Sequence, residues 1–82
     1  MNESPLIVRA YMRKGFQMKL VFENGLAGVV DLSKLVPLKF LNRLQNTGEL
    51  RLPMIDEVAG TVCWKDGTDL SHVRAYELLK KS

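Results

Sequence analysis

The feature that most constrains this chain is an alternation of apolar and polar side chains that continues from residue 6 to residue 32 and is interrupted twice by glycine turns. A period of two residues is typical of β-strands with one buried face. The interruptions, Arg13-Lys14-Gly15 and Glu23-Asn24-Gly25, are short enough to connect neighbouring antiparallel strands. The N-terminal part of the chain is therefore predicted to be a three-stranded antiparallel sheet.

The same alternation predicts which side chains share a face. A three-residue loop at each turn would pair Met12 with Phe16 and Phe22 with Leu26, and Gly15 would take the left-handed position. A two-residue second loop, suggested by Asn-Gly, is the alternative and would bury Ala27 and Val29 instead. We expect the buried face to carry Leu6, Val8, Ala10, Met12, Phe16, Met18, Leu20 and Phe22.

The remaining residues continue the pattern with two helices and two strands. Pro37 and the leucines that follow predict a helix over 37–46, and a final helix begins after Asp69 or Ser71, either of which suits a cap. Strands are expected at 50–55 and 61–64, and Trp64 is expected in the core. The prediction is one α+β domain, residues 1–82, with the order β-β-β-α-β-β-α: an antiparallel sheet with two short helices packed on one face.

Composition excludes several classes of protein. Apolar residues make up 46% and charged residues 26% of the 82 residues, which disfavours a disordered chain. Apolar runs are too short to span a bilayer, and no secretory signal is recognisable, so we expect a cytoplasmic protein without membrane contact. The single cysteine, Cys63, excludes a disulfide framework and is interpreted as a small buried residue.

The residues that could perform chemistry have simpler structural uses. Asp66, Asp69 and His72 are spaced three apart and could hold a divalent ion in a metal-dependent hydrolase, which is a remote alternative. However, Asp66 precedes a turn glycine, Asp69 lies where helix caps occur and His72 falls in a first helical turn. No catalytic, cofactor or metal site, and no small-molecule substrate, is therefore predicted, and the protein is expected not to be an enzyme.

The outward face of the predicted sheet is the main candidate site. Its mixture of apolar and basic residues favours a surface buried against another protein, although an ordinary solvated face would have a similar composition. A weak nucleic-acid platform is the other alternative, with Arg9, Tyr11, Arg13, Lys19 and Arg51 as its contacts. The predicted interface residues are Ile7, Arg9, Tyr11, Arg13, Lys19, Val21 and Val29.

Two segments, Leu20–Leu32 and Val62–Leu70, share a pattern with a known family. Phe-x-Asn-Gly followed by Val-Asp-Leu, and a later Trp-x-x-Gly-x-Asp-Leu, resemble the prokaryotic family called domain of unknown function 2442, over about residues 8–76. Members often have proline where this chain has Lys65, so that turn is expected to differ locally. The residues that carry the resemblance are Asn24, Gly25, Asp31, Trp64, Gly67 and Asp69.

The resemblance implies an α+β fold with no established activity. Some members are fused to a helix-turn-helix domain, and many are encoded beside a small partner, an arrangement that looks like a toxin-antitoxin pair. We therefore expect a non-enzymatic protein-interaction module, an antitoxin-like or regulatory half of a two-gene pair, that binds a protein partner or a second copy without any cofactor.

Overall fold

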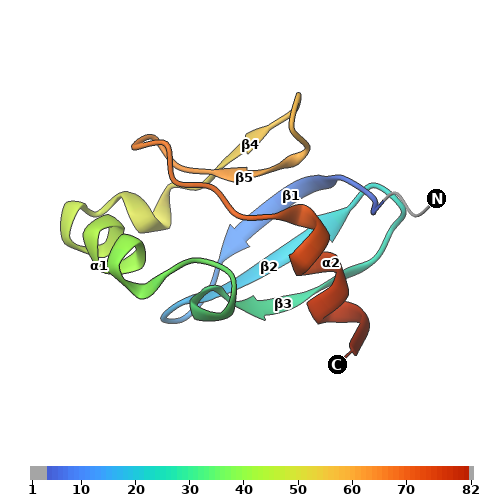
Figure 1. Ribbon diagram of the computed structural model, residues 1–82, viewed down its shortest axis with the longest axis horizontal. Coiled ribbons are helices and arrows are strands. Elements are labelled where there is room, and N and C mark those ends of the chain that lie inside the picture. The colour runs from blue at the N-terminus through green and yellow to red at the C-terminus, as the bar shows by residue number, and fades with distance from the viewer. Residues whose placement is uncertain (1–3, 82) are drawn as a thin grey trace.

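The computed structural model describes residues 4–81 and has the predicted α+β class. Its strands are antiparallel but form two sheets, β1-β2-β3 and β4-β5, where one sheet was expected. Two short 3-10 helices, η1 and η2, flank the first α-helix (Figure 1). The elements are β1 (Ile7–Met12), β2 (Gln17–Phe22), β3 (Ala27–Asp31), η1 (Leu32–Lys34), α1 (Leu38–Thr47), η2 (Glu49–Arg51), β4 (Met54–Asp56), β5 (Thr61–Cys63) and α2 (His72–Lys81).

The core lies on the inner face of the three-stranded sheet. Alternate residues of β2 supply its centre, since Met18, Leu20 and Phe22 are at most 1% exposed. Both helices add residues to the same cluster, and α2 lies across this face in front of β3 (Figure 1). Trp64 is in the core as predicted, 2% exposed, and its indole N–H donates to the carbonyl of Leu50 at 3.2 Å.

The start of β1 differs from the prediction because the strand contains a β-bulge. The pairing passes from Ile7 opposite Phe22 to Arg9 opposite Val21, so Val8 is an extra residue on β1. Consequently Ile7 is 1% exposed and Val8 is 46% exposed, the reverse of what we predicted. Ile7 belongs to the core and not to the outer face. The consecutive apolar residues at this point of the sequence gave no sign of the extra residue.

The first hairpin is displaced by two residues from the predicted pairing. Met12 lies opposite Met18 rather than Phe16, and the three-residue loop begins one residue later than expected, at Lys14. An even displacement leaves each paired side chain on its predicted face. Gly15 takes a positive φ of 64°, which suits a residue without Cβ.

The second hairpin is confirmed in its loop and its register. Phe22 donates its backbone N–H to the carbonyl of Leu26 at 2.8 Å, which closes a loop of three residues with Gly25 at a positive φ of 92°. Ala27 and Val29 therefore face outward, and the two-residue loop that would have buried them is excluded.

The segment after α1 is helical where a strand was predicted. Helix α1 follows Pro37 and ends at Gly48, whose φ is 80°. The chain then forms η2, so the expected strand over 50–55 is reduced to the three residues of β4. Leu50 is buried, whereas Leu52 is 69% exposed. Their apolar spacing resembled a strand, but Leu50 joins the core and its carbonyl accepts from the indole N–H of Trp64 within a helical turn.

Helix α2 begins directly after Ser71, which is one of the two residues predicted as its cap. Ser71 accepts a hydrogen bond from the backbone N–H of Arg74 at 3.3 Å, so Ser71 rather than Asp69 is the cap. The last turn carries Lys80 and Lys81, which suit the negative end of the helix dipole. No helix within residues 4–81 has the length and apolar character that crossing a membrane requires.

Candidate protein-interaction surface

The outer face of the three-stranded sheet is a grid of three rows, one residue from each strand in a row. The pairing of β1 with β2 and of β2 with β3 determines these neighbours. The backbone N–H of Arg13 bonds to the carbonyl of Gln17 at 2.8 Å and adds the last row. We call this grid the outer face; its rows are Arg9–Val21–Ala27, Tyr11–Lys19–Val29 and Arg13–Gln17–Asp31.

The outer face has a basic side and an apolar side. Arg9 in β1 and Arg13 directly after it lie on either side of Tyr11, which is 49% exposed. On the opposite side, Val21, Ala27 and Val29 are neighbours, and Val29 is 45% exposed. Apolar side chains next to aromatic and arginine side chains are typical of residues buried in protein interfaces.

The structure brings six of the seven predicted interface residues onto this face and leaves one out. Ile7 is excluded because of the bulge, and Val8, which the sequence assigned to the core, is exposed beside Arg9. Arg51, which is distant in sequence, is tied to the end of the first hairpin, because its guanidinium donates to the backbone carbonyl of Arg13 at 3.0 Å.

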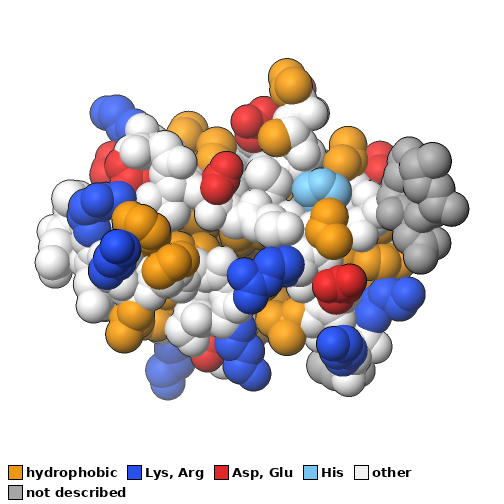
Figure 2. All heavy atoms as spheres, viewed as in Figure 1, with side chains coloured by type: hydrophobic (Ala, Val, Ile, Leu, Met, Phe, Trp, Pro, Cys, Tyr) orange, Lys and Arg blue, Asp and Glu red, His pale blue; other side chains and the backbone are white. Residues whose placement is uncertain are grey.

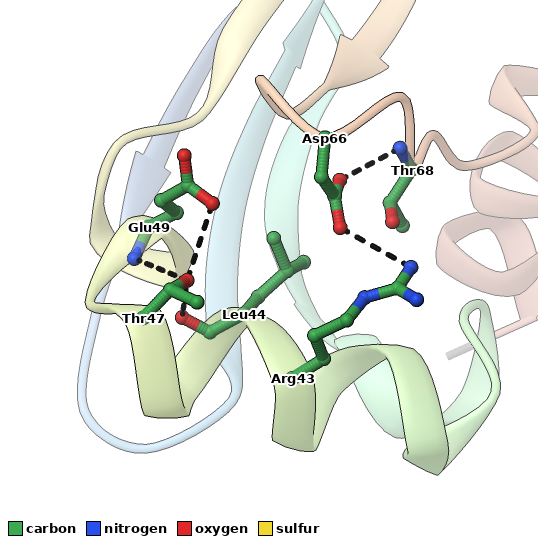
Figure 3. A network of polar contacts seen from close by, with 6 residues as sticks. All are labelled: Arg43, Leu44, Thr47, Glu49, Asp66 and Thr68. Atoms are coloured by element: carbon green, nitrogen blue, oxygen red, sulfur yellow. Dashed lines mark hydrogen bonds and ion pairs between the residues drawn. The ribbon is translucent and has the colours of Figure 1, made fainter.

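The three residues considered for a metal site do not act together. Asp66 accepts from the backbone N–H of Thr68 at 2.9 Å and pairs with Arg43 at 3.2 Å (Figure 3). His72 Nδ1 lies 3.2 Å from the carbonyl of Pro5, and Asp69 forms an isolated bridge with β5. Among residues 4–81, no group of three or more His, Cys, Asp or Glu side chains is placed to hold a metal ion.

Hydrogen bonds also account for the ionisation of Asp66. The backbone N–H of Thr68, followed by the side chains of Thr68 and Arg43, lowers the pKa of this carboxyl. A carboxylate held in this way is a weak proton donor or acceptor near neutral pH. Its role is to hold the turn after β5 against helix α1, as Figure 3 shows.

The residues that carry the family resemblance all have structural positions. The side chain of Asn24 accepts from the N–H of Leu26 at 3.1 Å, and Asp31 caps η1 through Ser33. Glycines occupy the positive-φ positions, with Gly67 at 94°. Of the six residues that carry the resemblance, only Asp31 lies on the outer face.

Cys63 has the environment of an unreactive thiol. It is partly buried in β5, and burial, with smaller effects from Asp56 and Asp69, raises the pKa of its thiol. A raised pKa keeps the group protonated at neutral pH, and the thiolate is the reactive form.

A small hollow between β1 and the β4–β5 hairpin was not predicted. Its volume is about 360 Å³, and its lining combines apolar side chains with two glutamates. Three distant segments form it, so no local pattern could have indicated it. The lining residues are Leu6, Ile7, Val8, Glu23, Ile55, Glu57 and Gly60.

The side of the molecule covered by the helices carries both apolar and charged side chains. Figure 2 shows this side, with apolar side chains at the tip of the β4–β5 hairpin and basic side chains scattered around α1 and α2. Val58, in that hairpin, is 97% exposed but has no apolar strand neighbours of the kind found on the outer face.

Comparisons with protein-family models, curated proteins and solved structures give no match.

Proposed function

We propose that this protein is a non-enzymatic interaction module that binds a protein partner through its outer face. The observation that carries the proposal is the continuity of Val21, Ala27 and Val29 beside the basic and aromatic residues of β1. Burying these apolar side chains against another protein contributes about 25 cal/mol of favourable free energy for each Å² of apolar area removed from water. The grid also supplies arginine and tyrosine, the residue types that most often dominate binding energy.

The proposed partner is the product of a neighbouring gene. Support comes from the resemblance to domain of unknown function 2442, whose members are often encoded beside a small second protein. In this proposal the chain acts as the antitoxin-like or regulatory half of the pair, in the cytoplasm.

Co-expression with the neighbouring gene tests the proposal. The two proteins should co-purify at a fixed stoichiometry, and Tyr11→Lys should weaken the complex about tenfold or more, because Tyr11 is exposed and lies in the middle row of the outer face. Val73→Lys is the matched control, since Val73 is 43% exposed but lies on α2. A chain that elutes alone in the presence of the neighbour, or a complex equally sensitive to both substitutions, would contradict the proposal.

A second candidate function is weak binding of nucleic acid, favoured by the position of Arg51 beside Arg13. Arg9, Lys19 and Arg13 lie in the same row as Tyr11 or in the rows beside it, and the Tyr11 ring is one on which a base could stack. Binding of this kind should fall steeply with salt and should weaken when Arg9 and Arg13 are both replaced by alanine. Lys80→Ala with Lys81→Ala removes the same charge from α2 and is the control. Absence of retention on DNA at low salt would eliminate this candidate.

A further inference from the structure

Strand β3 has a row of backbone groups with no strand partner in the described part of the chain. Its even-numbered residues bond to β2, because Phe22 N–H donates to Leu26 O and Leu32 N–H donates to Phe16 O, and hydrogen-bonded pairs alternate in an antiparallel ladder. The N–H and C=O groups of Ala27, Val29 and Asp31 therefore point away from β2. Within residues 4–81 these groups have no strand partner; the one of them that is already engaged is the carbonyl of Asp31, which accepts the first bond of η1 as its N-cap.

The opposite edge of the sheet is protected, whereas this edge is not. Strand β1 has a bulge at Val8, and the β4–β5 segment is tied to its start by the bond from Ile7 N–H to Gly60 O at 2.9 Å. Strand β3 has five residues, Ala-Gly-Val-Val-Asp, with no proline, lysine or bulge. Regular apolar edges of this kind readily accept a further strand.

We propose that β3 pairs with β3 of a second copy, in the antiparallel direction, to form a continuous six-stranded sheet. One register uses all the free groups: Val29 lies opposite Val29 of the second copy, with Ala27 opposite Asp31 on either side. Each of these pairs exchanges two hydrogen bonds, and the Asp31 carbonyl uses its second lone pair for this because η1 occupies the first. This register brings the apolar sides of the two outer faces together and keeps the two Asp31 carboxylates apart.

The distribution of charge also favours β3 over β1 as the strand that pairs between the two copies, a junction that we call the seam. In the six-stranded sheet the two β1 strands, with Arg9 and Arg13, are five strand spacings or about 24 Å apart. That separation exceeds the Debye length of about 8 Å at physiological salt, so the arginines of the two copies barely repel. Pairing through β1 would bring the same arginines together. On the inner side, Leu79 lies over Gly28, so α2 of each copy borders the seam.

The inference deepens the proposed function, because a β3 dimer doubles the outer face that meets the partner. It can nevertheless fail separately. A monomer that binds the neighbouring gene product through Tyr11 would contradict the dimer and leave the proposed function intact. A β3 dimer that binds no such partner would support the dimer and contradict the proposed function.

Val29→Pro tests the seam, and Val29→Thr is its matched control. Proline removes an N–H that has no intramolecular partner, so the monomer should keep its fold, while the dimer loses two of its hydrogen bonds and weakens about tenfold or more. Threonine keeps the N–H and the β-branched shape, so its dimer should survive. In sedimentation equilibrium the wild type and Val29→Thr should approach twice 9.3 kDa as concentration rises, and Val29→Pro should stay near 9.3 kDa.

Amide exchange of the wild type provides a readout that does not depend on a variant. In the monomer, the backbone amides of Gly28 and Val30 should be protected from exchange, and those of Ala27, Val29 and Asp31 should not. In the dimer, all five amides should be protected, and the protection should increase with protein concentration. The inference is overturned if the wild type remains a monomer with the three odd-numbered amides unprotected. It is equally overturned if a dimer forms that Val29→Pro leaves unchanged.

Discussion

Four side chains, Asn24, Asp31, Asp56 and Asp66, each accept a hydrogen bond from the backbone N–H two residues ahead. This short-range bond is the Asx turn, which holds the chain in a bend without any help from the core. Three of the four lie in the segments Leu20–Leu32 and Val62–Leu70. Asp66, the one of these four that was considered as a metal ligand from the sequence, is therefore explained by the local geometry of its turn.

Asp31 should make the stability of the protein depend on acid pH. Hydrogen bonds from the side chain and then the backbone N–H of Ser33 lower the pKa of Asp31 in the folded state. Its stabilising contribution is therefore complete above the ordinary aspartate pKa of about 3.9 and is lost as pH falls through the lower folded value. Asp31→Asn should keep the turn acceptor but show a shallower fall in the free energy of unfolding below about pH 4.

Urea denaturation of both proteins across the acid range measures this difference. Ser33→Ala, which removes the hydroxyl and keeps the backbone donor, should give an intermediate slope with pH. Equal slopes for the wild type and Asp31→Asn would show that the carboxylate of Asp31 does not stabilise the fold.

At the scale of elements, the bulge in β1 decides which residues form the outer face. The bulge brings Ile7 inside and leaves Val8 exposed. Ile7→Lys should destabilise the protein by about 3 kcal/mol or more, because a buried lysine loses its hydration. Val8→Lys, one residue away, should change the free energy of unfolding by no more than about 0.5 kcal/mol.

Thermal or urea unfolding of these two variants checks the bulge directly. Both introduce the same side chain on the same strand, so differences in net charge and strand propensity cancel. If Val8→Lys proves the more damaging of the two, β1 is a regular strand with the faces first predicted from its alternation.

The elements differ in how far the sequence could predict them, for physical reasons. The hairpin between β2 and β3 was predictable in register, because Asn24 and Gly25 supply the turn and the alternation on both strands is unambiguous. The bulge was not, because Leu6, Ile7 and Val8 are all apolar and fit either face. Leu50 and Leu52 likewise share the spacing of a strand, and only the tertiary contact with Trp64 shows that η2 forms there.

For the whole molecule, the composition of the outer face could be predicted but its neighbours could not. The strands and their outward residues followed from the period of two, so Tyr11, Lys19 and Val29 were identified as sharing a face. That the three form one row depended on the register of β1, which the displaced first hairpin changed. The approach of Arg51 to Arg13 spans 38 residues and required the complete fold.

The central claim is that the outer face is the part of this protein that meets its partner. The most direct measurement is the change in backbone amide NMR signals of the labelled protein when it binds the co-expressed neighbour. We predict that the signals of Arg9, Tyr11, Lys19 and Val21 change most, and that those of α2 beyond Ala75 change least. Changes confined to α2 or to the hollow beside the β4–β5 hairpin, with the outer face unaffected, would contradict the account.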